Sequence, residues 1–253
     1  MASKVPEVTV FFWIIKVLAT TVGETAADLL NFNLGLGLAG TTIAMFVVLA
    51  VAMVLQYRAP KYIPWRYWLV VILVSIAGTL ITDNLTDALG VPLEATTTVF
   101  AVALAVVFFW WYRSERTLSI HSITTRRRET FYWAAILVTF ALGTAAGDLL
   151  AERLSLGYLL SAALFATVIA FIGLFYGLRV LGGVFAFWAA YVLTRPLGAS
   201  LGDWVAQPAD SGGLNLGTVG PSVACLLAVV VLVGYLSFSR RDQITTEDFS
   251  APA

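Results

Sequence analysis

Long apolar runs alternate with short polar segments along this chain, and residues 13–28 (WIIKVLATTVGETAAD) show the pattern that the rest repeats. The polar residues Lys16, Thr20, Glu24 and Asp28 are four positions apart. A step of four returns to nearly the same face of an α-helix. The segment therefore predicts a helix that carries a lysine, a hydroxyl and two carboxylates on one side and is otherwise apolar.

The same frame of tryptophan, glycine and aspartate occurs four times. Its copies are Trp13/Gly23/Asp28, Trp68/Gly78/Asp83, Trp133/Gly143/Asp148 and Trp188/Gly198/Asp203. Three residue types at fixed offsets in four copies indicate an internal repeat. Positions 7, 11, 15 and 19 after each tryptophan form four stripes, which are Thr20, Glu24, Asp28, Phe32; Ser75, Thr79, Asp83, Asp87; Phe140, Thr144, Asp148, Glu152; and Arg195, Ala199, Asp203, Gln207.

The apolar runs are long enough to cross a bilayer, for which a helix needs about 20 residues. Helices are expected at about 8–30, 41–57, 65–85, 95–111, 131–150, 158–178, 184–204 and 217–238. The sequence thus predicts an all-α integral membrane protein with eight transmembrane helices, arranged as four parallel helix-hairpin repeats. Its expected parts are an N-terminal tail (1–7), a first half (8–113), a cytoplasmic linker (114–130), a second half (131–238) and a C-terminal tail (239–253).

Composition supports this class and excludes others. Hydrophobic residues make up 60% of the chain and charged residues 12%, about half the charged content of average soluble domains. The runs do not alternate as the strands of a β-barrel would. The formal net charge is zero, which does not favour nucleic acid as a partner. Motifs for nucleotide binding, nucleophilic catalysis or a cysteine-based metal site are absent from the sequence, so neither an enzyme nor a cofactor is expected.

Basic residues predict the orientation. Most of the fifteen lysines and arginines fall in the termini and in the loops that join even-numbered to odd-numbered helices, whereas the opposite loops carry only Arg153. Basic loops remain on the cytoplasmic side of membrane proteins. Both termini are therefore expected in the cytoplasm.

The polar stripes are expected to face inward, because a charge that faces lipid at mid-depth costs at least about 2.5 kcal/mol. The odd-numbered helices would then surround a polar-lined centre, and the even-numbered helices would form an outer layer. The repeated glycines would allow neighbouring helices to approach closely. The tryptophans suit the membrane interface, which places Glu24 near mid-membrane and the four aspartates about 22 Å from that interface.

Five carboxylates are the candidate ion-binding residues: Glu24, Asp28, Asp83, Asp148 and Asp203. Glu24 and Asp28 are the candidate metal ligands, because hard oxygen ligands suit Mn²⁺, Mg²⁺ or Ca²⁺. Lys16, Arg195, Asp87 and Glu152 are expected to gate the site or balance its charge. Pro196, which follows Arg195, is expected to kink its helix. In the alternative interpretation, the aspartates cap helix ends and Arg195 forms a structural ion pair with Glu24 or an aspartate.

The motif GETAAD (Gly23–Asp28), its echoes GTLITD, GTAAGD and GASLGD, and the opening KVPEVT resemble a bacterial family of uncharacterised membrane-anchored proteins built from repeats of a domain of unknown function. The resemblance implies a multi-pass protein of the bacterial inner membrane. A weaker likeness is to manganese/calcium–proton exchangers with Glu-x-Gly-Asp-Lys/Arg-Ser/Thr motifs. Here the order is Gly-Glu-Thr-x-x-Asp, and the basic residue and second glycine are absent from the first copy.

Three functional hypotheses follow. The first is a transporter or channel for a small cation, including a proton-coupled transporter of a divalent metal such as Mn²⁺. The second is a non-transporting membrane scaffold or sensor whose polar stripes are structural. The third is a transporter of a small anionic solute at Lys16 and Arg195. The expected partners are the lipid bilayer and the transported ion or solute, and the sequence does not specify an oligomeric state.

Overall fold

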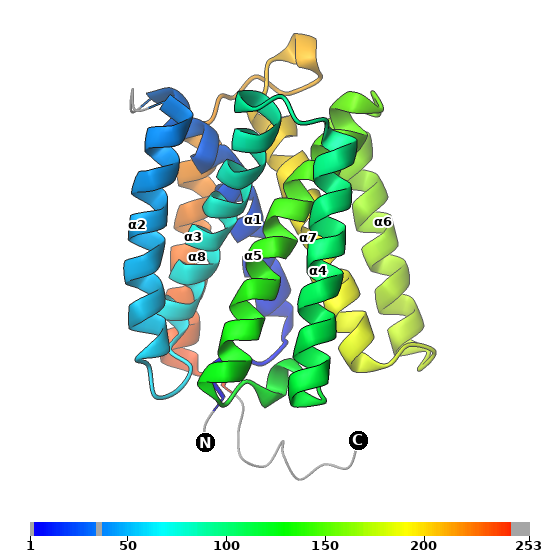
Figure 1. The fold of residues 1–253 in the computed structure, drawn as a ribbon. Coiled ribbons are helices and arrows are strands. Elements are labelled where there is room, and N and C mark those ends of the chain that lie inside the picture. Colours follow the sequence, from blue (N-terminus) through cyan, green and yellow to red (C-terminus); the bar gives the residue numbers. More distant parts are fainter. Residues whose placement is uncertain (1–2, 34–36, 244–253) are drawn as a thin grey trace.

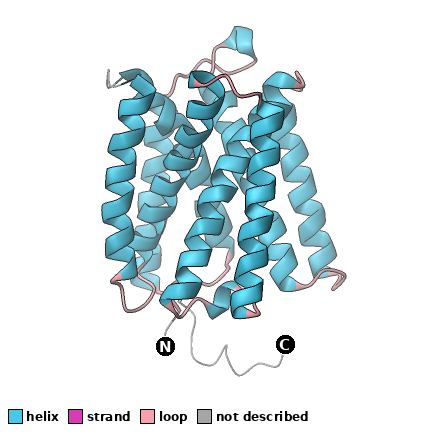
Figure 2. Ribbon diagram, viewed as in Figure 1, coloured by secondary structure: helices cyan, strands magenta, loops and turns pink. Residues whose placement is uncertain are grey.

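The computed structural model, described for residues 3–33 and 37–243, is a bundle of eight long helices (Figure 1). They are α1 (Val10–Asn33), α2 (Gly37–Tyr57), α3 (Pro64–Asp83), α4 (Leu93–Glu115), α5 (Arg126–Asp148), α6 (Tyr158–Gly177), α7 (Gly183–Ala206) and α8 (Val219–Ser239). The described residues form no strand (Figure 2). All eight helices are long and apolar enough to cross a membrane, which confirms the predicted fold class.

Local sequence explains several helix ends. Pro64 begins α3, where its missing N–H removes no helical hydrogen bond. The Thr125 side chain accepts a hydrogen bond from the backbone N–H of Arg128 and so caps α5. Two inner helices extend beyond their repeated aspartates through π-helical turns at equivalent positions, Asn84–Ala88 and Leu149–Arg153.

The odd-numbered helices form a closed inner ring. α1 packs against α3 and α7, and α5 packs against the same two helices from the other side. In the spanning windows of these four helices 56–67% of residues are buried, compared with 11–22% in the even-numbered helices. The predicted inner and outer layers are therefore confirmed.

Each outer helix packs against the inner helix of the next repeat. α2 lies on α3, α4 on α5, α6 on α7, and α8 returns to α1. The two helices of one repeat make few contacts with each other. A single repeat therefore cannot bury its own apolar surface, and the ring needs all four copies to close.

The repeated glycines hold the inner ring together, as expected. A Cβ atom at Gly23 would lie 1.9 Å from the Ser75 hydroxyl, and one at Gly198 would lie 1.9 Å from the Thr20 hydroxyl. In all four copies the glycine contacts the residue seven positions after the tryptophan of the next inner helix. These pairs are Gly23–Ser75, Gly78–Phe140, Gly143–Arg195 and Gly198–Thr20. The repeat in the sequence is thus a four-fold pseudosymmetry in the packing.

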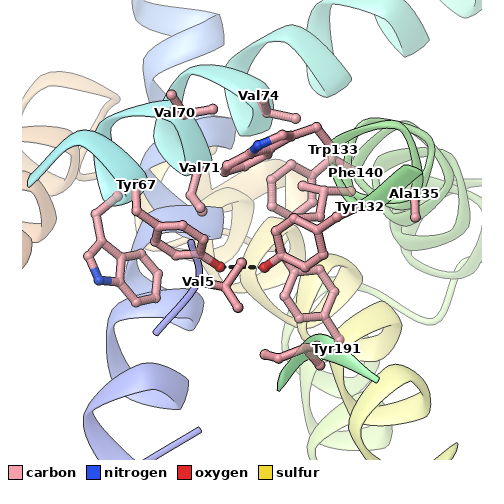
Figure 3. Close-up of a cluster of buried hydrophobic side chains, with 14 of the residues drawn as sticks. Val5, Tyr67, Val70, Val71, Val74, Tyr132, Trp133, Ala135, Phe140 and Tyr191 are labelled. Atoms are coloured by element: carbon pink, nitrogen blue, oxygen red, sulfur yellow. Dashed lines mark hydrogen bonds between the residues drawn. The ribbon is translucent and has the colours of Figure 1, made fainter. Parts of the chain in front are cut away.

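An aromatic layer fills the end of the ring where the described chain begins and ends, at residues 3 and 243, called here the terminal end. The hydroxyls of Tyr67 and Tyr132 share a hydrogen bond there, close to Val5 (Figure 3). Trp68 and Trp133 are also buried in this layer. Trp68, Trp133 and Trp188 are buried within the protein rather than exposed to lipid, and the expected depth of the repeated tryptophans at the membrane interface stays a prediction.

The N-terminal segment was expected to be a polar tail, but residues 3–6 are buried at the terminal end. The Lys4 amine lies 2.7 Å from the Glu129 carboxylate. The backbone N–H of Glu7 donates to the carbonyl of Asp242 at 2.8 Å, which joins the two ends of the described chain. The segment therefore packs as part of the bundle. The expected C-terminal tail lies outside the described residues from position 244 onward.

Candidate functional site

Arg195 lies at the centre of the inner ring with its side chain fully buried. Its guanidinium donates to the Glu24 carboxylate at 2.8 Å, to the Thr144 hydroxyl at 2.7 Å and to the Thr79 hydroxyl. The three acceptors come from α1, α5 and α3, and each lies eleven positions after its tryptophan. One side chain of α7 thus connects all four inner helices.

Packing explains why the guanidinium can reach this position. A Cβ at Gly143 would lie 2.2 Å from Cγ of Arg195, so only glycine leaves room for the arginine stem beside α5. Glu24 also accepts a hydrogen bond from the Thr79 hydroxyl at 3.3 Å. α7 continues through Pro196 as one helix. The ion pair between Arg195 and Glu24, which the sequence left as an alternative, is present.

Lys16 lies on the aromatic side of this network and does not pair with Glu24. Its side chain is fully buried, with Nζ 4.0 Å from the Phe140 ring centroid and 4.3 Å from that of Tyr191. Within the described part of the chain Nζ has no hydrogen-bond partner. The faces of aromatic rings attract a cation electrostatically, so the Phe140 and Tyr191 rings stabilise the Lys16 ammonium.

The four repeated aspartates form a ring of carboxylates, called here the acid ring, one helical turn beyond the Arg195 network and away from the terminal end. Asp28, Asp83 and Asp148 are half-buried, and Asp203 is buried. The four aspartates occupy equivalent positions on the four inner helices, which pack around one centre. No hydrogen bond or ion pair engages any of the four carboxylates in residues 3–33 and 37–243.

Helix capping does not account for two of these aspartates. Asp83 and Asp148 immediately precede the two π-helical turns, and neither side chain forms a capping hydrogen bond. Inserted π-helical turns are frequent at functional sites. Capping of the π-helical turns therefore does not explain the presence of Asp83 and Asp148 in the acid ring.

The remaining candidates lie at the rim of the acid ring. Asp87 is exposed and accepts from the Thr86 hydroxyl at 2.9 Å, while Glu152 is exposed and accepts from the Tyr158 hydroxyl at 2.9 Å. Across the described ranges, no three histidine, cysteine, aspartate or glutamate side chains lie close enough together to hold a metal ion. The proposed metal pair of Glu24 and Asp28 therefore lacks a third ligand of these types, and Glu24 is already bonded to Arg195.

Sequence reasoning placed Thr79 and Thr144 on the polar stripes without recognising that they bind Arg195. Their position in the repeat, equivalent to that of Glu24, was the available signal. The pairing of Lys4 with Glu129 had no comparable signal, because the two residues are 125 positions apart and belong to no common motif.

Comparison with known families agrees with the repeat. The family described as Repeat of Unknown Function (DUF347) matches residues 11–62, 66–117, 131–179 and 186–242. The chain belongs to this family. Each DUF347 match covers most of one inner helix and the whole of the outer helix that follows it. No curated protein and no solved structure matches the chain.

Proposed function

We propose that this protein transports a small inorganic cation across the membrane, and that the cation enters at the acid ring. The main observation that supports this proposal is a ring of four carboxylates at equivalent positions of the inner helices. In the described structure none of these carboxylates has a hydrogen-bond or ion-pair partner. Ionisable groups within spanning helices are costly and typically mark ion pathways.

The partial exposure of the acid ring favours a hydrated ion over a chelated one. Asp28, Asp83 and Asp148 each retain accessible surface, and no cluster of three ligands is formed by the described residues. Acidic groups that line a low-dielectric opening concentrate cations near them. A cation or proton that arrives at the acid ring would reduce the repulsion between its carboxylates.

The Arg195–Glu24 pair is proposed to act as the gate. The guanidinium is a fixed positive charge across the centre of the ring, so it repels a cation that moves past the acid ring. A cation or proton that competes for Glu24 would weaken the 2.8 Å bond between Glu24 and Arg195. Beyond this pair the aromatic layer and residues 3–6 close the terminal end. We interpret the structure as a state closed to the terminal side.

The proposed location is the bacterial inner membrane, with the terminal end in the cytoplasm. The distribution of basic residues supports this orientation. The acid ring would then receive cations from outside the cell.

The two other hypotheses have less support from the contacts. A binding site for an anionic solute would need an accessible cation, but Arg195 is already bonded to Glu24, Thr79 and Thr144, and Lys16 is fully buried against aromatic rings. A purely structural scaffold explains the Arg195 network well. It does not explain four carboxylates that contribute no bond to the described fold.

Ion flux into proteoliposomes tests the proposal, with a panel of monovalent cations, divalent cations and protons. Asp28→Asn is expected to abolish flux while leaving the protein folded, because its carboxylate has no partner to lose. Glu94→Gln is the matched control, since Glu94 is exposed and pairs with Arg153 outside the inner ring. Absence of any cation flux in the wild type, or equal flux in Asp28→Asn and the wild type, would contradict the proposal.

A further inference from the structure

A cavity of about 560 Å³ lies at the terminal end, outside the inner ring. The start of α1, the last turns of α6 and the first turns of α7 enclose it, and the loop between α4 and α5 contributes its rim. Apolar side chains such as Val8, Ile169 and Val184 form one part of the wall. Glu7, His121 and other polar residues form the rest, so the cavity has an apolar part and a polar part.

The polar part carries an acidic group that is not fully satisfied. One Glu7 oxygen lies 3.2 Å from Nε2 of His121, whereas the other, Oε2, is buried without a hydrogen-bond partner in the described structure. Among the described residues that line the cavity, none is a lysine or an arginine. Trp13 and Tyr176 add aromatic surface to the same cavity, and the Tyr176 ring packs over Gly183. A carboxylate beside aromatic rings suits an ammonium group.

The position of the cavity indicates the source of that ammonium group. The cavity lies at the ends of helices that are long enough to span a membrane, where lipid headgroups are expected, and α6 belongs to the outer layer of the bundle. An occupant at this depth with both a polar head and an apolar body is a membrane lipid. The acidic rim disfavours lipids with a net negative headgroup and favours one with a primary ammonium.

We propose that this cavity binds the headgroup of phosphatidylethanolamine. The ammonium contacts the Glu7 carboxylate, whose side chain is 33% exposed, and the lipid phosphate accepts hydrogen bonds from donors at the same rim, namely Ser119 and Tyr176. The first part of the acyl chains follows the apolar wall between α6 and α1. This site is independent of the proposed transport pathway, because none of its residues belongs to the acid ring or to the Arg195 network.

Thermal unfolding of delipidated protein in maltoside micelles, with either phosphatidylethanolamine or phosphatidylglycerol added back, tests the site. A ligand that binds only the folded state raises the melting temperature as its concentration increases. We expect phosphatidylethanolamine to raise the melting temperature of the wild type more than phosphatidylglycerol does. Glu7→Gln should abolish this difference between the two lipids, and Glu94→Gln should retain it.

Two further variants separate lipid binding from fold stability. His121→Gln removes the 3.2 Å contact between His121 and Glu7 but leaves the carboxylate, so the preference for phosphatidylethanolamine should persist. Ala190→Leu fills the apolar wall and should abolish the effect even though Glu7 is present, which provides the test if Glu7→Gln does not fold. Equal shifts with both lipids in the wild type, no shift with either, or an undiminished preference in folded Glu7→Gln or in Ala190→Leu would overturn the proposal.

Discussion

Replacing Glu24 with glutamine tests whether the central ion pair holds the inner ring together. The Arg195 side chain is fully buried and that of Glu24 is 7% exposed. Water therefore cannot solvate the guanidinium when the Glu24 carboxylate is removed. Removing one partner of a buried ion pair typically costs about 3–5 kcal/mol, because the remaining charge stays buried. Glutamine retains an oxygen that can accept from Arg195, which places the expected loss of unfolding free energy at about 3 kcal/mol.

The measurement is the unfolding free energy in mixed micelles for Glu24→Gln, Arg195→Met and the double variant. When two residues contact each other, the effects of replacing them on the unfolding free energy do not simply add, and the coupling energy is about 0.5–3 kcal/mol. Each single variant leaves one buried charge without its partner, whereas the double variant has neither charge. The double variant should therefore lose less unfolding free energy than the sum of the two single losses, by at least about 1 kcal/mol.

Asp28→Asn is the matched control for this experiment. Asp28 lies one helical turn from Glu24 on the same stripe, but its carboxylate has no partner in the described structure. Its replacement should leave the unfolding free energy unchanged or raise it. Equal losses for Glu24→Gln and Asp28→Asn, or strictly additive effects of Glu24→Gln and Arg195→Met, would refute the reasoning.

Two other predictions concern helix packing and pH. A Cβ at Gly198 would lie 1.9 Å from the Thr20 hydroxyl, so Gly198→Ala should lower the unfolding free energy by about 1–3 kcal/mol. Gly220→Ala should leave the unfolding free energy unchanged, because no atom of the described structure lies within 4 Å of the added Cβ. Similar losses in Gly198→Ala and Gly220→Ala would argue against the close approach of the helices at Gly198. Burial raises the pKa of Asp242, and the hydrogen bond that Tyr62 donates to Asp242 partly opposes this rise. Because the folded protein holds this proton more tightly than the unfolded chain, Asp242 contributes to stability at low pH, and the contribution is lost as pH rises through the raised pKa. Asp242→Asn should therefore flatten the dependence of the melting temperature on pH above the usual carboxyl range, and an unchanged profile would contradict this assignment.

The periodic pattern predicted the inner ring because charge and lipid are incompatible. Four stripes with the same spacing require four helices that face one centre, and the structure has them. The glycine contacts followed from the same repeat, since equivalent residues on equivalent helices meet at equivalent places. The close approach of Gly143 to Arg195 is one instance of this rule.

The candidate site was predictable in its composition but not in its bonds. Glu24, Arg195 and the aspartates were identified from their positions in apolar helices. Whether Arg195 would bind Glu24 or an aspartate depended on how far its stem extends along the ring axis. Helix register within the bundle determines that distance, and the sequence of one helix does not encode it.

The eight spans, the four-fold repeat and the inward direction of the polar stripes could be predicted from the chain alone, because they follow from local periodicity and from the cost of charge in lipid. Three other features became visible in the folded bundle: each outer helix packs on the next repeat, residues 3–6 close the terminal end, and Lys16 lies on aromatic rings. These features depend on contacts between segments far apart in the chain. Their geometry is set by the closure of the whole ring rather than by any local pattern.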